Sequence, residues 1–242
     1  MTRLLELDNV YKRFGGIVAT DGLSFHVNKG ESLALIGPNG AGKTTIFSLI
    51  MGEIRQNSGS IKLNGEELTR LPTHKRIQRG IARTYQVPRP FADMDVAGNI
   101  RVGMMPDNLW QMLAIGPDPD EELAIARSVG FRDADLARPP SELSMGDLRK
   151  LELARTLAAK PEIMLLDEVF AGLTVGEIEQ ISDLLAEKRK DGLTYVIVSH
   201  DLRALEPLVD RAVAMTFGKA IAEGEFHEVM DDEAVRAAYL GQ

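Results

Sequence analysis

Eight consecutive residues near the start of the chain have the types and spacing that bind nucleotide phosphates. They are Gly37-Pro38-Asn39-Gly40-Ala41-Gly42-Lys43-Thr44, followed by Thr45, and they fit the phosphate-binding loop pattern at every fixed position. The glycines allow backbone conformations that aim successive N–H groups at one anion. The pattern places Lys43 to reach the β- and γ-phosphates and the Thr44 hydroxyl to ligate Mg²⁺. This loop therefore predicts binding of a nucleoside triphosphate with Mg²⁺.

A second candidate site is an apolar segment that ends in two acids. Residues Ile163 to Leu166 are all apolar and lead into Asp167 and Glu168. An aspartate at the tip of a buried strand beside a phosphate loop suits a Mg²⁺ ligand, held directly or through water. Glu168 could point at the attacking water as a general base, a role worth about 10²–10⁴-fold in rate. Together with the loop, these acids predict hydrolysis of a nucleotide.

A third segment precedes a helix. It is Leu143-Ser144-Met145-Gly146-Asp147, and the helix that follows carries one apolar face, made of Leu148, Leu151, Ala154, Leu157 and Ala158. Ser144 fits an N-cap, and Asp147 three residues later completes a capping-box pattern. Taken alone, this segment indicates only a well-capped helix.

With all three segments in place, the sequence resembles the ATP-binding cassette (ABC) family over essentially the whole chain. That family has a Leu-Ser-Gly-Gly-Gln-like signature before the second acidic motif, and here Ser144 lies 23 residues before Asp167. The resemblance implies that ATP is the nucleotide. It also implies that the Ser144 hydroxyl and the Gly146 N–H contact the γ-phosphate of ATP held by a second ATPase subunit, in a head-to-tail dimer.

The resemblance assigns roles to further residues. Tyr11 falls where the family places an aromatic ring on adenine, and Gln86 falls where it places a glutamine that senses Mg²⁺ and the transmembrane partner. His200 matches the switch histidine that contacts the γ-phosphate, and residues Ala171 to Thr174 match the loop that crosses the dimer interface. We expect Glu168, His200 and Gln86 to act in catalysis.

Three positions depart from the family pattern. Met145 replaces the first signature glycine, Asp147 replaces the glutamine, and Val169 replaces the proline that commonly follows the catalytic glutamate. These changes bear on the turnover rate more than on nucleotide binding.

The elements that must position these residues alternate between strand and helix patterns. Strand patterns cover Ser32–Ile36, Gly59–Leu63, Ile81–Gln86, Ile163–Leu166 and Thr194–Val198, and a helix pattern covers Glu233–Leu240. Residues 91–160 contain only helical patterns and breaks. This predicts an α/β fold with a parallel sheet. We expect one domain over 1–242, with a nucleotide-binding core of 1–90 and 161–242 and a helical signature subdomain of 91–160; the resemblance adds an N-terminal antiparallel β subdomain.

Composition limits the partners and the location. The 36 acidic and 28 basic residues give a formal net charge of −8, which disfavours nucleic acid, and zero cysteines exclude disulfides and thiolate chemistry. No apolar run is long enough to span a bilayer. We expect a cytoplasmic protein that is peripheral on the inner face of the plasma (inner) membrane. Its partner chains would contain the membrane-spanning segments. The basic stretch His74 to Arg79 is expected to be a solvated helix face.

Within the ABC family, three segments resemble the ATPases of branched-chain amino-acid importers. They are Tyr11–Gly16, Thr84–Phe91 and the tail Val235–Gly241. This implies transmembrane permease subunits as partners, a second ATPase subunit of the same or a different kind, and indirectly a periplasmic substrate-binding protein.

Three alternatives stay open. The first is the ATPase of a lipopolysaccharide or lipid transport complex, and the second is a soluble ABC ATPase of DNA repair or translation. A regulatory cassette without catalysis is the third, and the presence of Lys43, Asp167, Glu168 and His200 argues against it.

Overall fold

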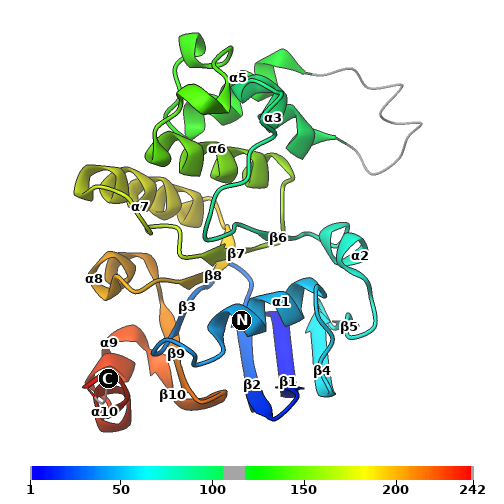
Figure 1. Ribbon diagram of the computed structural model, residues 1–242, viewed down its shortest axis with the longest axis vertical. Coiled ribbons are helices and arrows are strands. Elements are labelled where there is room, and N and C mark those ends of the chain that lie inside the picture. The colour runs from blue at the N-terminus through cyan, green and yellow to red at the C-terminus, as the bar shows by residue number, and fades with distance from the viewer. Residues whose placement is uncertain (1, 106–117, 241–242) are drawn as a thin grey trace.

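The computed structural model describes residues 2–105 and 118–240, which form two β-sheets and a set of helices (Figure 1). The first sheet is antiparallel, in the order β2-β1-β4-β5. Its strands are β1 (Arg3–Phe14), β2 (Ile17–Asn28), β4 (Ser58–Leu63) and β5 (Glu66–Glu67). Leu5 and Leu7 are buried at the two-residue spacing of a sheet with one face on the core.

The second sheet is mixed, with the strand order β10-β9-β3-β8-β7-β6. It contains β3 (Ser32–Ile36), β6 (Ile81–Arg83), β7 (Ile163–Asp167), β8 (Thr194–Val198), β9 (Arg211–Thr216) and β10 (Lys219–Glu225). β10 pairs antiparallel with β9, and the other pairs are parallel. Every residue of β3, β7 and β8 is buried, as expected for parallel strands covered on both faces.

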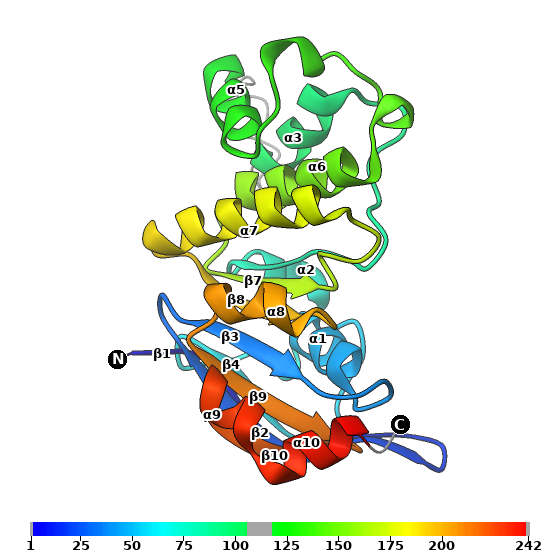
Figure 2. The same ribbon diagram turned by 90° about the vertical axis from the view of Figure 1, so that its left-hand side faces the viewer.

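Helices cover the second sheet and form one end of the molecule (Figures 1 and 2). Near the sheets lie α1 (Lys43–Met51), α2 (Thr73–Ile77), α7 (Val175–Lys190), α8 (Leu202–Leu205), α9 (Phe226–Asp231) and α10 (Glu233–Leu240). The far end holds α3 (Val96–Met104), α5 (Pro119–Ser128) and α6 (Met145–Ala158). Short 3₁₀ turns cover Asp133–Asp135, Pro140–Glu142 and Glu206–Leu208.

The second sheet separates two apolar clusters because successive side chains of a strand point to opposite faces. Leu33 and Leu35 of β3 belong to the cluster shared with α1 and the first sheet. Ala34 and Ile36 belong to the other cluster, which includes residues of α6 and α7. The strand that leads into the phosphate loop is therefore clamped from both sides.

The predicted α/β fold class is confirmed, and the predicted bounds of β3, β8 and α10 agree with the structure. The strand predicted to reach Gln86 is wrong at its end, because β6 stops at Arg83. The N–H of Thr84 still donates to Leu165 of β7, but the next backbone groups bond to side chains of α6. The Tyr85 N–H donates to Glu152 at 3.0 Å, and Arg149 donates to the carbonyl oxygens of Tyr85 and Gln86.

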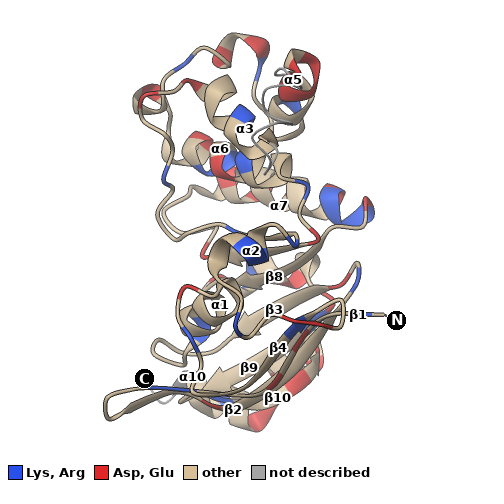
Figure 3. Ribbon diagram, turned by 90° about the vertical axis from the view of Figure 1, so that its right-hand side faces the viewer, with Lys and Arg blue, Asp and Glu red and all other residues tan. Residues whose placement is uncertain are grey.

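The expectation of a solvated basic face at 74–79 is wrong for Arg76. This residue lies on α2, a basic helix in Figure 3, yet it is fully buried. Its guanidinium donates to the carbonyl oxygens of Leu49 and Ile50 at 2.7 and 2.8 Å. These carbonyls lie in the last turn of α1, where the regular hydrogen bonds of a helix run out, and Leu49 also accepts from the N–H of the C-cap residue Gly52. Burial lowers the pKa of Arg76 to about 10. Arg76 therefore caps the helix that begins at the phosphate loop.

Candidate active site

Close backbone contacts hold the loop between β3 and α1 in one conformation. Gly37 has a φ of 147°, and a Cβ atom on it would lie 2.1 Å from the carbonyl oxygen of Met215. Gly42 has a φ of 105°, and a Cβ atom there would lie 2.3 Å from the carbonyl oxygen of Ala19. Any side chain would clash at both positions, so only glycine lets the loop pass between β2 and β9.

A cavity of about 300 Å³ opens beside this loop. Its lining contains Asn39, Gly40, Ala41, Gly42, Lys43, Thr44 and Thr45 from the loop and α1, together with Gln86, Glu168 and His200. The exposed apolar side chains of Ile17 and Val18 also lie along it. The fold thus gathers most of the predicted site residues at one cavity.

Lys43 is the cation of this cavity. Its Nζ donates to the carbonyl oxygen of Gly37 at 2.5 Å and to that of Pro38 at 3.0 Å. Burial lowers the pKa of Lys43, while the carboxylates of Glu168 and Asp167 act in the opposite direction. The ammonium group is folded back on its own loop. A phosphate would offer it a charged acceptor, which makes a stronger hydrogen bond than a carbonyl does.

Glu168 is held in an uncommon backbone conformation. Its φ of 51° lies in the left-handed region, which is favoured by glycine. Its N–H donates to the carbonyl oxygen of Val198 at 2.9 Å, and its carboxylate lies 3.3 Å from Nε2 of His200. The His200 N–H also donates to this carboxylate at 3.3 Å. Such strain is typical of functional sites, and a carboxylate fixed at a cavity can accept a proton from water.

Asp167 is buried next to Glu168 and pairs with an arginine. Its Oδ2 accepts from Arg83 at 2.7 Å, and both side chains are only 4% exposed. Arg83 also donates to Glu53 and to the hydroxyl of Ser48 on α1. Asp167 is thereby fixed between β6 and α1, the helix that follows the phosphate loop.

A buried ion pair on α6 connects three parts of the site. Arg149 and Glu152 lie 2.6 Å apart, with side chains 0% and 2% exposed. Arg149 donates to the carbonyl oxygens of Tyr85 and Gln86 at 2.6 and 2.8 Å, and to that of Glu168 at 3.5 Å. Burial raises the pKa of Glu152, and the Tyr85 N–H and Arg149 oppose the shift. The helix after the signature segment is thus bonded to the backbone of both Gln86 and Glu168.

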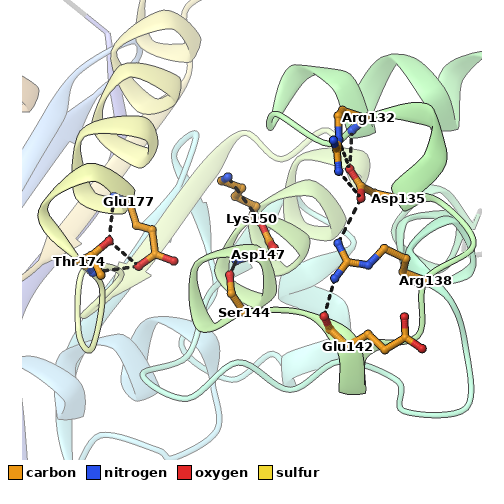
Figure 4. Close-up of polar contacts among 9 residues, drawn as sticks. All are labelled: Arg132, Asp135, Arg138, Glu142, Ser144, Asp147, Lys150, Thr174 and Glu177. Atoms are coloured by element: carbon orange, nitrogen blue, oxygen red, sulfur yellow. Dashed lines mark hydrogen bonds and ion pairs between the residues drawn. The ribbon is translucent and has the colours of Figure 1, made fainter.

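The signature segment, residues 143–147, lies against the start of α7 (Figure 4). The Ser144 hydroxyl accepts from the N–H of Asp147 at 3.0 Å, so Ser144 caps α6 as predicted. A Cβ atom on the buried Gly146 would lie 2.2 Å from the Glu177 carboxylate. Thr174 and Glu177 form a capping box at the start of α7, and the backbone and hydroxyl of Thr174 lower the pKa of Glu177.

Six predicted site residues do not line the cavity of the phosphate loop in the described part of the chain: Tyr11, Gly37, Pro38, Ser144, Gly146 and Asp167. Tyr11 is half-buried in β1, where its carbonyl oxygen accepts from the N–H of Asn57. Sequence reasoning also missed Arg83 and Arg149. The signal for Arg83 was a single basic residue at the end of an apolar strand. The signal for Arg149 was an arginine three residues before a glutamate, a spacing that places the two on one side of a helix.

Two family models match the chain. The model described as "ABC transporter" matches residues 20–171, and the model described as "Branched-chain amino acid ATP-binding cassette transporter" matches residues 221–242. Three curated relatives match over 99% of this chain and 98% of their own length. BraF of Pseudomonas aeruginosa and LivG of Escherichia coli, both high-affinity branched-chain amino acid transport ATP-binding proteins, are 32% identical. LptB of Haemophilus influenzae, a lipopolysaccharide export system ATP-binding protein, is 36% identical.

Solved structures agree with this grouping. A nucleotide-free ATP-binding cassette from an ABC transporter superposes with a TM-score of 0.88 at 28% identity, and each chain is covered completely. The ADP conformation of MJ1267, another ATP-binding cassette of an ABC transporter, also has a TM-score of 0.88, at 29% identity over both whole chains.

The phosphate loop, the strand-end acids and these matches define a phosphate-loop ATPase. The chain belongs to the ABC transporter family, as an ATP-binding subunit that hydrolyses ATP for a transporter. In the part of the chain that the structure describes, no helix has the length and apolar character needed to cross a membrane.

Proposed function

We propose that this chain is the ATP-hydrolysing motor of an importer for branched-chain or related amino acids. The observation that carries the proposal is the match of residues 221–242 to the branched-chain amino acid transporter model. The rest of the chain is similar both to amino-acid transport ATPases and to a lipopolysaccharide export ATPase, so the C-terminal segment is what favours amino acids.

In the proposed site, the loop 37–44 cradles the triphosphate of ATP, and Lys43 leaves its own loop for the phosphates. Thr44, Asp167 and Gln86 hold Mg²⁺, directly or through water. When bound, Mg²⁺ neutralises charge on the β- and γ-phosphates. Thr44 and Gln86 fit this ion because both line the cavity, and Thr44 is exposed on it. Asp167 does not line the cavity and is paired with Arg83, so it would act on the ion through water or after leaving this arginine. Mg²⁺ on a nucleotide needs few protein ligands.

The proposed chemistry is proton transfer at Glu168. Its carboxylate accepts a proton from the attacking water, and His200 holds that carboxylate and contacts the γ-phosphate. Tyr11 is assigned to the adenine ring. Because Ser144 and Gly146 lie away from the cavity of their own chain, we assign them to the nucleotide of a second ATPase subunit. ATP bound between two subunits favours their closed dimer, and hydrolysis removes the bridging phosphate.

The proposed contact with the transmembrane subunits is a cavity of about 880 Å³ between the end of α2 and the ends of α3 and α6. Ile77, Phe91 and Met105 line it, and these residues are 47%, 45% and 48% exposed. These apolar groups adjoin the segment that carries Gln86, so we assign the surface to a cytoplasmic helix of a permease subunit. We place the chain on the inner face of the membrane, and its importer would receive cargo from a periplasmic binding protein.

One other candidate has support of its own. The 36% identity to LptB of Haemophilus influenzae favours an ATPase of a lipopolysaccharide or lipid transport complex. Its partners would be lipid-export permeases.

The deciding experiment is co-purification from native membranes. The Glu168→Gln variant, with a tag at its N-terminus, is extracted in detergent with ATP, and its partners are identified by mass spectrometry. We expect two multi-span permeases and an ATPase subunit, and ATP-dependent uptake of labelled leucine when the complex is placed in liposomes. Recovery of lipid-export permeases would overturn the amino-acid assignment, and recovery of soluble nucleic-acid machinery would overturn transport.

A further inference from the structure

The C-terminal helix reaches the phosphate loop from the far end of the chain. The hydroxyl of Tyr239 on α10 accepts a hydrogen bond from the N–H of Gly37 at 2.8 Å, across 202 residues of sequence. Figure 2 shows the last turn of α10 lying near the loop that joins β3 to α1. The bond links the C-terminal segment, used above only to assign the cargo, to the first residue of the phosphate loop.

Gly37 is bonded on both of its polar groups. Its N–H donates to Tyr239, and its carbonyl oxygen accepts from Lys43 at 2.5 Å. The close approach of Met215 leaves the residue no room for a side chain. The N–H of Gly37 is therefore directed at α10, and the position of the loop depends on the groups that hold this one glycine.

Tyr239 is itself held in place. Its ring packs against the apolar cluster that contains Ala34 and Ile36, so the side chain is half-buried. Burial raises the pKa of Tyr239, and the negative charge of Glu168 acts in the same direction. The hydroxyl stays protonated at neutral pH and lies close enough to Glu168 to respond to its charge.

Nucleotide binding changes the balance of these bonds. Lys43 uses two of its three N–H donors on the carbonyl oxygens of Gly37 and Pro38, so contact with both the β- and the γ-phosphate requires it to give up at least one of these bonds. If it gives up the bond to Gly37, the N–H bond to Tyr239 is the hydrogen bond that still holds this glycine. The Tyr239 hydroxyl would then restrain the loop most when nucleotide is bound.

We propose that Tyr239 is a positioning residue for ATP binding, whose hydroxyl fixes Gly37 and so orients the phosphate loop, and that the C-terminal helix is thereby part of the nucleotide site. The proposal rests on phosphate binding by the loop 37–44 and does not depend on the cargo.

The test compares Tyr239→Phe with wild type in the full chain. Phenylalanine keeps the ring and removes the acceptor of the Gly37 N–H. We expect the KM for ATP and the Kd for Mg²⁺-ADP to rise about 5–30-fold, the effect of losing one buried hydrogen bond, with kcat within about twofold. The matched control is Tyr195→Phe, which removes a buried hydroxyl that donates to the carbonyl oxygen of Leu208, away from the loop. We expect it to leave KM, Kd and kcat unchanged.

A second measurement follows the Gly37 amide directly. In wild type, hydrogen exchange at the Gly37 amide should be slow, and in Tyr239→Phe it should be faster. Rapid exchange in wild type, equal nucleotide affinity of Tyr239→Phe and wild type, or equal losses in both variants would overturn the role of Tyr239. Failure of the wild-type chain to bind Mg²⁺-ADP would instead overturn the phosphate site itself.

Discussion

The carboxylate of Glu168 is held from two directions. The left-handed turn and the bond from its N–H to Val198 fix its backbone, and His200 holds its carboxylate through both a ring nitrogen and the backbone N–H. A base that is already oriented needs little reorganisation when water attacks. Its position thus depends on β7 and β8 lying side by side, since Val198 ends β8.

Glu168→Gln should therefore separate binding from hydrolysis. Glutamine keeps the shape of the side chain but cannot take a proton, so we expect ATP hydrolysis to fall about 10²–10⁴-fold with little change in ATP affinity. Phosphate release and equilibrium binding measure the two effects. Glu162→Gln is the control, because Glu162 precedes the opposite end of β7 and pairs only with Lys29 at the surface in the described structure. Unchanged hydrolysis in Glu168→Gln would remove Glu168 from the role of base.

At the scale of elements, α6 is joined to the active site by the pair Arg149–Glu152. The pair is fully buried, and it satisfies backbone groups where β6 ends early. A buried ion pair contributes little net stability, yet breaking one is costly because a buried charge is left without a partner.

We expect Arg149→Met to destabilise the protein by about 3–5 kcal/mol at pH 7. The loss should depend on pH. Burial raises the pKa of Glu152 above 4.5, and removing Arg149 takes away one of the groups that oppose this shift. The folded variant then binds a proton more readily than the unfolded chain, so its free energy of unfolding should rise as pH falls through the raised pKa.

Urea unfolding of Arg149→Met between pH 7 and pH 5 measures this effect. Lys150→Met, on the same helix, is the control, because Lys150 forms a looser pair with Asp147 at 3.6 Å. Its loss should be small and independent of pH. If Arg149→Met is equally destabilised at both pH values, Glu152 does not carry the charge that we assign to it.

The bounds of β3, β8 and α10 could be predicted because apolar runs and helical spacing are local signals. The burial of Arg76 could not, because its acceptors are carbonyls of α1, distant in sequence. The early end of β6 and the pairing of Arg83 with Asp167 depend likewise on partners from other elements. The residues of the phosphate loop could be predicted to lie together because they are consecutive in the sequence.

At the scale of the whole molecule, the signature segment and the phosphate loop lie on different parts of the fold. Ser144 is exposed at the start of α6, and the cavity that contains Lys43 does not include it among the described residues. If Ser144 contacts a γ-phosphate, that phosphate belongs to another subunit. The cavity of one chain then supplies only part of an active site.

Ser144→Arg in the assembled transporter tests this division. We expect the affinity of the phosphate loop for ATP to stay near wild type, while the hydrolysis rate falls about 10²–10³-fold, as on removing a donor that stabilises transition-state charge. Ser141→Arg is the control, an exposed position in the turn just before the segment. Near-normal hydrolysis by Ser144→Arg would contradict a shared site.

The position of α10 also determines where a label can be attached without disturbing the nucleotide site. Tyr239 on α10 touches the phosphate loop, so an affinity tag or fluorescent label attached to this helix would lie beside the nucleotide. The start of β1 lies on the other side of the molecule in Figure 2. Labels placed before β1 should leave catalysis intact, whereas labels on α10 should weaken nucleotide binding.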